Sequence, residues 1–357
     1  MAPQMMKAAI CKEPGKPLVV EEIPVPEPTG RFILVKVKAA SLCHSDLGII
    51  DGTFGSLMMP LVVGHEAISI VEKLGPDAGG YGINVGDTVG ASLWHDSCLN
   101  CVDCKTAGAE FCKKMQIKGM TSPGCFSEYT LVDPVATVVV RKAEDKSDAP
   151  ISDLSPLFCA GITVWDAIER AKVRPGDSVA ILGVGGLGQM AARYATELGA
   201  KVFVLDVRDE QLNAAKSDGI ADETINIKML SPQELEDKVM ELNGGVLLDT
   251  AIVTTGVVPA YLSAMGIVRV AGHIIAVGLP HESIPLNSNV IAQRCFSITG
   301  AKVPGKKGIQ RCIDYSMKKN IRPKINDRKF VLEDINEMIA LMKAGEVDKG
   351  RMLVEFF

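Results

Sequence analysis

The chain lacks an excess of basic residues, which argues against two broad classes of partner. Among its 357 residues, 38 are Lys or Arg and 43 are Asp or Glu, so the formal net charge is -5 at pH 7. Proteins that bind nucleic acid or anionic membranes usually carry clustered positive charge. We therefore expect no nucleic acid and no membrane as partner, and a small molecule as substrate.

The chain has little that resembles a targeting or membrane segment. Its first 14 residues include two lysines and lack the apolar core of about 7–15 residues that a secretory signal needs. Thr250–Val268 has no charge over 19 residues. However, glycines and a proline interrupt it, and buried parallel strands produce the same apolar runs. We predict a cytoplasmic protein.

An internal repeat and a low-complexity linker are also absent, so most of the chain should fold. Apolar residues make up 47% and charged residues 23%, which is ordinary for a globular enzyme. A chain of this length exceeds the usual size of one hydrophobic core. Two domains are therefore expected.

The pattern of apolar residues changes along the chain. Up to about residue 155, short β-type runs such as Ile33–Lys38 and Ala67–Val71 alternate with Gly and Pro, which predicts an irregular, mostly β domain. From Ser178, apolar runs alternate with helical segments, which is typical of a parallel α/β sheet. The strands expected there are Val179–Leu182, Lys201–Leu205 and Val246–Leu248. After about residue 295 we expect short strands, one amphipathic helix near Leu332–Lys343 and a last strand at Met352–Phe356.

A glycine-rich turn follows the first of these α/β strands and opens a helix. It consists of Gly183, Val184, Gly185, Gly186, Leu187 and Gly188. In this pattern the first glycine permits a tight turn, the second lets the backbone approach a pyrophosphate, and the third lets the helix pack on the strand.

Asp206 strengthens that motif, because it ends the next strand, 18 residues past Gly188. A carboxylate there can bond both ribose hydroxyls and repel a 2′-phosphate, so the pattern predicts NAD rather than NADP. Two alternatives remain open. Asp206 can be a solvated acid at a strand end, and Arg208 can in principle accept a phosphate.

Four of the ten cysteines fall in one short segment: Cys98, Cys101, Cys104 and Cys112. Four thiolates at this spacing can surround one ion tetrahedrally and leave no open position, which defines a structural zinc site. The alternative is a set of unrelated buried thiols.

A second set of metal-ligand residues is dispersed. Cys43 begins Cys-His-Ser-Asp, His65 lies in Gly-His-Glu, and Cys159 begins Cys-Ala-Gly-Ile-Thr. Three protein ligands with an open fourth position are what a catalytic zinc requires. Taken singly, each residue is more often an inert thiol or a core histidine.

Together these segments resemble the zinc-containing medium-chain alcohol dehydrogenases, especially the shorter yeast-type members. The resemblance covers nearly the whole chain. It implies a GroES-like, mostly β catalytic domain at residues 1–155 and 295–357, into which a Rossmann domain with a doubly wound parallel sheet is inserted at residues 156–294. It further implies reversible hydride transfer between NAD and a primary or secondary alcohol, two zinc ions per chain (one catalytic and one structural), and a homo-oligomer, specifically a tetramer.

The resemblance also implies roles for individual residues. Cys43, His65 and Cys159 would hold the catalytic zinc, which lowers the pKa of the bound alcohol. Asp46 would orient the ring of His65, Glu66 would lie beside the metal, and Ser45 would accept the proton of the alcohol. His44, Val277 and Arg351 are assigned to the cofactor site, and Phe54, Trp94 and Leu279 to the apolar walls of the substrate pocket.

Simpler interpretations exist for several of these residues. Ser45 can stabilise a turn, Arg351 can form a surface salt bridge, and the three pocket residues can be core. The chain also departs from the yeast-type pattern, because Gly48 stands where a histidine would end the proton relay. If the pocket walls are apolar, the substrate is a largely apolar or aromatic alcohol.

Other functions are compatible with parts of the sequence. An enone or quinone reductase of the same superfamily would share the fold and the glycine turn but would not need the metal ligands. A polyol dehydrogenase would typically have glutamate in place of Cys159. A zinc-binding, redox-responsive protein without turnover would depend on the segment Cys98–Cys112 alone.

Overall fold

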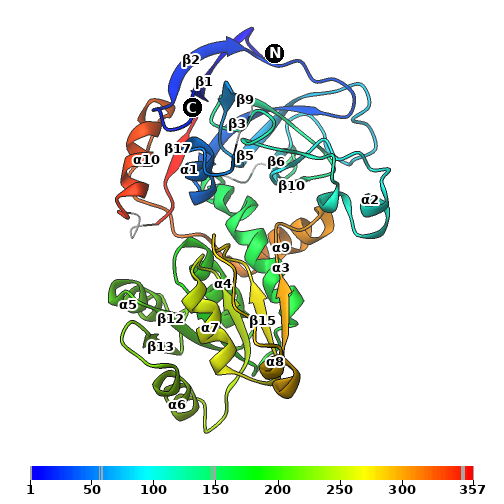
Figure 1. Cartoon of the computed structure of the whole chain (residues 1–357). Coiled ribbons are helices and arrows are strands. Elements are labelled where there is room, and N and C mark those ends of the chain that lie inside the picture. The colour runs from blue at the N-terminus through cyan, green and yellow to red at the C-terminus, as the bar shows by residue number, and fades with distance from the viewer. Residues whose placement is uncertain are drawn as a thin grey trace. The chain divides into compact units, whose positions relative to one another are not determined.

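The computed structural model describes residues 2–55, 57, 59–145, 147, 150–346 and 350–356. The chain divides into two compact units (Figure 1). Unit 1 comprises Met1–Cys159, Val303–Met317 and Arg322–Phe357, and unit 2 comprises Ala160–Lys302 and Lys318–Ile321.

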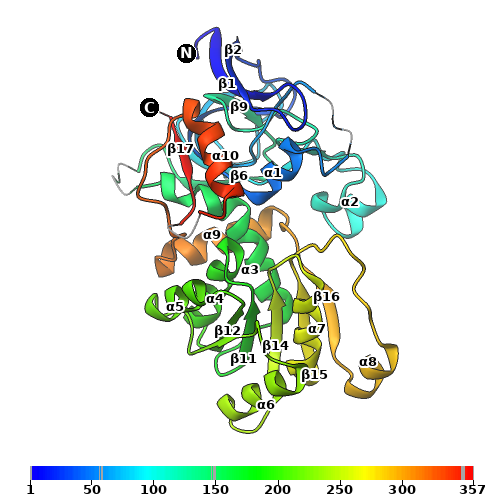
Figure 2. The same ribbon diagram turned by 60° about the vertical axis from the view of Figure 1, so that its left-hand side comes forward.

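Unit 2 is built around a six-stranded parallel sheet (Figure 2). Its strands, in spatial order, are β13 (Glu223–Asn226), β12 (Lys201–Asp206), β11 (Ser178–Leu182), β14 (Leu248–Val253), β15 (Val268–Ala276) and β16 (Ser297–Gly300). Numbered from β11, this is the order 3-2-1-4-5-6 of a doubly wound dinucleotide-binding sheet. The predicted doubly wound parallel sheet is therefore confirmed.

Helices connect these strands and pack on each other in pairs, α3 with α4 and α6 with α7. The helices of unit 2 are α3 (Ala160–Ala171), α4 (Gly186–Glu197), α5 (Asp209–Ser217), α6 (Pro232–Leu242), α7 (Val258–Ile267) and α8 (Ser288–Arg294). Strand β11 is buried at every residue, which explains why its sequence is apolar throughout Val179–Leu182.

One strand of unit 2 begins later in the sequence than we predicted. We expected a strand at Val246–Leu248, but β14 begins only at Leu248. Gly244 and Gly245 both have positive φ and turn the chain after α6, and Val246 is 58% exposed. The apolar run therefore starts in the connection rather than in the strand.

Among its described residues, unit 1 contains three sheets, with three, six and two strands. The first has the order β2 (Val19–Pro24), β1 (Met5–Cys11) and β4 (Leu61–Val62). The second runs β10 (Thr137–Arg141), β6 (Thr88–Ala91), β5 (Glu66–Leu74), β3 (Ile33–Ser41) and β17 (Leu353–Glu355), and β9 (Tyr129–Val132) also pairs with β3. The third is the two-residue pair β7 (Trp94–His95) and β8 (Gln116–Ile117). Unit 1 is thus the irregular, mostly β part of the molecule.

Short helical segments complete unit 1. They are α1 (His44–Ile50), α2 (Val102–Thr106), α10 (Ile335–Lys343) and the 3₁₀ segments η1 (Ala109–Phe111), η2 (Ser152–Phe158) and η3 (Leu332–Asp334). The predicted carboxyl-terminal helix corresponds to η3 and α10. The prediction of one helix after residue 295 was wrong, because α9 (Lys306–Lys319) is a second, longer one. Its buried Ile309, Cys312, Ile313 and Ser316 form a helical stripe among charged residues.

The uncharged window Thr250–Val268 consists of a buried strand, a turn and helix α7 rather than one helix. Within the described parts of the chain, no helix combines the length and apolar character that crossing a membrane requires.

Candidate active site and metal-binding lobe

Strand register in unit 1 brings Cys43 and His65 together. β3 and β5 are antiparallel, and Ser41 at the end of β3 faces Glu66 at the start of β5. Cys43 follows β3 by two residues and precedes α1, while His65 directly precedes β5. Gly64 has a φ of +94° and lies so close to the ring of Phe126 that a Cβ would come within 2.8 Å of it. A glycine is thus required for the turn that presents His65.

Cys159 completes this cluster from a distant part of the sequence. It ends η2, which packs on β3 and β5. Ligand atoms of Cys43, His65, Glu66 and Cys159 all lie within 4.8 Å of one another. Two thiols and an imidazole within such a distance are suited to zinc.

Asp46 positions the imidazole of His65. Its Oδ1 lies 2.9 Å from Nδ1 of His65, and its Oδ2 accepts the backbone N–H of Cys43 at 2.9 Å. Asp46 is fully buried, and His65 is 5% exposed. The contact with Nδ1 leaves Nε2 available to a metal, as in a carboxylate–histidine–metal arrangement.

The thiols and the imidazole influence one another's ionisation. Hydrogen bonding from Cys159 lowers the pKa of Cys43 well below its ordinary value; burial opposes this, and His65 adds to it. Burial lowers the pKa of His65, but the charges and hydrogen bonds of Asp46 and Cys43 together outweigh burial and raise it well above its ordinary value. Cys43 is therefore the thiol that ionises first.

Glu66 is fully buried beside the cluster. Its Oε2 accepts hydrogen bonds from Ser41 and from Arg351, whereas its Oε1 is buried and has no hydrogen-bond partner among the described residues. Burial raises the pKa of Glu66 to about 7, and the positive charge of Arg351 opposes that shift. The unpartnered oxygen suits a group that contacts a cation.

Arg351 lies with Glu66 rather than on the surface. Its Nη2 donates to Glu66 and, at 2.9 Å, to the carbonyl of Leu42. Its side chain is 16% exposed, so the alternative of a surface salt bridge is wrong. Ser41 and Leu42 are partners that the sequence did not reveal, because no local motif marks them.

The first turn of α1 is open to solvent. His44 and Ser45 are exposed, and the Oγ of Ser45 lies 3.8 Å from Sγ of Cys43. Farther along, a Cβ on Gly48 would come within 2.4 Å of the ring of Phe54. The ring of Phe54 therefore occupies the space that a side chain at position 48 would need.

The expected pocket residues differ in exposure. Phe54 is 49% exposed and Leu279 is 82% exposed, so core packing does not account for these two. Trp94 is half-buried in unit 1, where its indole N–H donates to the carbonyl of Val303 at 3.2 Å. Phe54 and Trp94 belong to unit 1, and Leu279 belongs to unit 2.

A second cysteine cluster lies in the segment between β7 and β8, residues 96–115, which we call the cysteine lobe. The ligand atoms of Cys98, Cys101, Cys104 and Cys112 lie within 4.8 Å of one another. Sγ of Cys98 is 4.0 Å from that of Cys104 and 3.5 Å from that of Cys112. Tetrahedral zinc with bonds of about 2.3 Å separates its sulfurs by about 3.8 Å. The four thiols therefore fit one zinc ion.

Backbone N–H groups point at the sulfurs of the cysteine lobe. Cys98 and Lys114 donate to Cys112 at 3.3 and 3.4 Å, and Cys104 donates to Cys101 at 3.4 Å. Backbone donors of Asn100 and Cys101 lower the pKa of Cys98 to about 6. Such donors favour thiolates, the form that binds a metal.

In unit 2 the glycine turn has the geometry that its sequence implies. Gly183 has a φ of +88°, and a Cβ on Gly188 would come within 1.9 Å of the carbonyl of Gly183. Gly185 caps α4, and a Cβ there would meet no atom within 4 Å. The first and third glycines are thus needed by the fold, whereas the second faces open space.

Asp206 is tied to that turn by a contact that the sequence did not indicate. One carboxylate oxygen accepts the N–H of Val184 at 2.8 Å, and the other accepts those of Val207 and Arg208 at 2.8 and 3.1 Å. Asp206 is 8% exposed, so it is not a solvated acid. Val277 is also buried in this unit.

Comparison with known proteins agrees with this architecture. The family model described as alcohol dehydrogenase GroES-like domain matches residues 31–143, and the one described as zinc-binding dehydrogenase matches residues 186–316. An alcohol dehydrogenase of Geobacillus stearothermophilus is 32% identical over 98% of this chain and 99% of its own length. One from Moraxella sp. (strain TAE123) is 29% identical over the same shares.

The crystal structure of the alcohol dehydrogenase of Aeropyrum pernix superposes with a TM-score of 0.86 at 26% identity, covering 98% of this chain and 100% of the other. The chain therefore belongs to the zinc-containing medium-chain alcohol dehydrogenase family. It is a zinc-dependent alcohol dehydrogenase with a GroES-like domain and a Rossmann domain, as the sequence predicted.

Proposed function

We propose that Cys43, His65 and Cys159 hold the catalytic zinc of this dehydrogenase and that the cysteine lobe holds a structural zinc. The observation that carries the proposal is the convergence of two thiols and an imidazole within 4.8 Å, with Asp46 behind the imidazole. Bound zinc supplies Lewis acidity toward the alcohol oxygen, and NAD accepts the hydride. Glu66, with one unpartnered oxygen, is a further group available to the ion.

Residues on α1 orient the site and move protons. Asp46 keeps Nδ1 of His65 occupied, which fixes the orientation of the ring. Ser45 is exposed next to Cys43 and is the hydroxyl that would accept the alcohol proton. Gly48 has no side chain that could take up a proton, and Ser45 is exposed, so the proton passes from Ser45 to solvent.

NAD is the cofactor, and most of its proposed binding residues lie in unit 2. The proposed set is the glycine turn from Gly183 to Gly188 together with Asp206 and Val277, and His44 and Arg351 from unit 1 are proposed to contact the pyrophosphate. The backbone bonds of Asp206 hold its carboxylate in one orientation, which favours ribose hydroxyls and disfavours a 2′-phosphate. Arg208 lies 3.8 Å from Asp206, so part of its charge is already neutralised.

We further propose a largely apolar or aromatic alcohol as substrate, with Phe54, Trp94 and Leu279 as pocket walls. The exposure of Phe54 and Leu279 supports this assignment, because a side chain packed in the core could not line a pocket that a substrate enters. A screen of linear, branched and aromatic alcohols and aldehydes, followed by NADH absorbance, tests this choice.

Three broader assignments accompany this function. The described residues, which include all ten cysteines, contain no disulfide bond, and this supports a cytoplasmic location. β16 lies at the edge of its sheet and is mostly exposed, which supports a homo-oligomer, proposed to be a tetramer. We place the domain boundaries at residues 155 and 295, near the limits of units 1 and 2.

Replacing a catalytic zinc ligand tests the central proposal. Cys43→Ala or His65→Ala should lower turnover at least ~100-fold, because Lewis-acid stabilisation contributes several kcal/mol. NAD binding, measured by calorimetry, should persist, and the zinc content should fall from two ions per chain to one.

Cys11→Ala is the matched control, since Cys11 is a fully buried thiol of unit 1 outside both clusters. It should keep both ions and its turnover. Full activity in the Cys43→Ala or His65→Ala variant would rule out the proposed site.

A further inference from the structure

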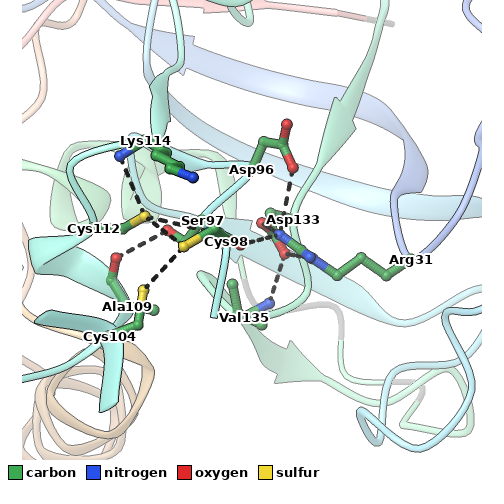
Figure 3. A network of polar contacts seen from close by, with 10 residues as sticks. All are labelled: Arg31, Asp96, Ser97, Cys98, Cys104, Ala109, Cys112, Lys114, Asp133 and Val135. Atoms are coloured by element: carbon green, nitrogen blue, oxygen red, sulfur yellow. Dashed lines mark hydrogen bonds and ion pairs between the residues drawn. The ribbon is translucent and has the colours of Figure 1, made fainter. Parts of the chain in front are cut away.

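Arg31 and Asp133 form a buried ion pair beside the cysteine lobe (Figure 3). Nε of Arg31 donates to Oδ1 of Asp133 at 2.9 Å, and Nη2 donates to Oδ2 at 2.7 Å. The side chain of Asp133 is fully buried and that of Arg31 is 21% exposed. A two-point contact between a guanidinium and a buried carboxylate holds both groups in one geometry.

The same guanidinium also holds the start of the cysteine lobe. Its Nη2 donates to the carbonyl of Ser97 at 2.8 Å, and Ser97 directly precedes Cys98. The carboxylate of Asp96 lies 3.7 Å from the same nitrogen. Arg31 therefore contacts the two residues through which the chain enters the four-cysteine segment, as Figure 3 shows.

Ser97, which Arg31 holds, also connects two parts of the cysteine lobe. Its hydroxyl donates to the carbonyl of Ala109 at 2.9 Å, on the η1 turn that leads to Cys112. The N–H of Cys98 donates to Sγ of Cys112 at 3.3 Å. Holding the peptide between Ser97 and Cys98 therefore also holds the first cysteine against the last.

We propose that Arg31 is a positioning residue for the metal of the cysteine lobe, and that its bond to Ser97 slows the release of that metal. This inference rests on the proposed function, because it requires the four cysteines to bind an ion. An ion leaves a four-thiolate site only after a thiolate moves away, and an anchored Cys98 has fewer ways to move. Groups that orient metal ligands change metal affinity by about 10–100-fold when they are removed.

Arg31→Lys separates this role from the stability of the fold. A lysine keeps a positive charge near Asp133, but one ammonium cannot reproduce the two-point contact together with the bond to Ser97. Ser97→Ala is a second variant. It leaves the ion pair of Arg31 and Asp133 in place and removes only the hydroxyl bond to Ala109.

Lys142→Met is the matched control. Lys142 pairs at 3.0 Å with Asp87, which is 1% exposed, in the same unit but outside the cysteine lobe. This substitution removes the cation from a buried carboxylate altogether, whereas Arg31→Lys keeps a positive charge near Asp133. It therefore shows whether general loosening of unit 1 is enough to release the metal.

The experiment measures zinc release from the full chain carrying Cys43→Ala, so that the remaining ion belongs to the cysteine lobe. The purified protein is mixed with an excess of a chromogenic zinc chelator, and absorbance is followed with time. We expect Arg31→Lys to release zinc at least ~10-fold faster than the parent. Ser97→Ala should also be faster, Lys142→Met should equal the parent, and circular dichroism should be unchanged throughout.

Three results would overturn the inference. Equal release rates in the Arg31→Lys variant and the parent would do so while leaving the metal site itself intact. Equal acceleration by Arg31→Lys and Lys142→Met would show general loosening instead of positioning. A Cys43→Ala parent that holds no zinc would remove both this inference and the assignment of the cysteine lobe.

Discussion

Asp46 and Asp206 show how one buried carboxylate can serve both the fold and the chemistry. Asp46 accepts from Cys43 and faces His65, so it holds two proposed metal ligands at once. Asp206 accepts three backbone N–H groups, including that of Val184 in the glycine turn. Replacing either by alanine would leave buried donors without partners, which itself costs free energy.

Asp206→Asn is a sharper test of cofactor choice than alanine, because the amide oxygen can still accept the backbone N–H groups on one side of the carboxylate. We expect the KM for NAD to rise by about 10- to 100-fold, since a hydrogen bond to a charged group contributes about 1.5–3 kcal/mol. Activity with NADP should rise relative to NAD, because the negative charge that repels a 2′-phosphate is gone. Steady-state kinetics with both cofactors measures this ratio.

Asp249→Asn is the control for that substitution. Asp249 accepts from Ser178 and pairs with Arg269 in the same unit, away from the glycine turn. Its replacement should change the melting temperature but not the ratio of the two cofactors. If Asp206→Asn leaves that ratio unchanged, Asp206 does not select NAD.

Gly48 illustrates how a departure from a family pattern can have a local steric cause. A Cβ at this position would overlap the ring of Phe54. The absence of a relay histidine and the placement of Phe54 are therefore linked, since a larger side chain at position 48 would require that ring to move. The sequence showed the missing histidine but not the neighbour that takes its space.

At the scale of elements, the turn between β11 and α4 separates the glycine that packing requires from the one that packing leaves free for the proposed cofactor contact. A Cβ on Gly188 would lie 1.9 Å from a backbone oxygen, so α4 would have to move away from β11. A Cβ on Gly185 would meet nothing within 4 Å. The same substitution should therefore have different effects at the two positions.

Gly188→Ala should destabilise the protein by about 1–3 kcal/mol, the usual range for overpacking. Gly185→Ala should leave the free energy of unfolding nearly unchanged and weaken NAD binding, because the methyl group projects where the pyrophosphate approaches the backbone. Urea unfolding and calorimetric titration with NAD measure the two effects. Similar losses of stability in both variants would contradict this division of roles.

In the part of the chain after residue 295, the sequence pattern predicted one helix and missed another. The helix ending at Lys343 was predicted, but α9 was not. Its apolar stripe is narrow, with only Ile309, Cys312 and Ile313 as buried apolar side chains. So few apolar residues do not predict an amphipathic helix from the sequence, and the helix is recognised only when the structure shows what buries them.

At the scale of the whole molecule, β16 is the outer strand of the parallel sheet, and Ile298 on it is 37% exposed. An exposed strand edge readily pairs with another chain. If a second copy covers this edge, Ile298→Lys should shift the protein toward smaller assemblies, because a charge would be buried at the contact. Light scattering coupled to size-exclusion chromatography measures the mass.

Val246→Lys is the control, since Val246 is 58% exposed in the same unit but in a connection rather than on the sheet edge. It should leave the mass unchanged. An unchanged mass in the Ile298→Lys variant as well would exclude this edge as the contact between subunits.

The amino-acid sequence by itself determined the features that are local along the chain. The four cysteines of the lobe, the glycine turn and the strand that ends at Asp206 each lie within one short segment, and backbone geometry alone brings their parts together. The order of these motifs along the chain also indicated the family, and with it the reaction.

Only the tertiary structure decided how distant residues meet. Cys43, His65 and Cys159 converge because the antiparallel register sets Ser41 opposite Glu66 and because η2 packs on both strands. The bonds from Arg31 to Ser97 and from Arg351 to Glu66 likewise join segments far apart in sequence. Such contacts depend on packing and strand register, which no short segment of the chain encodes alone.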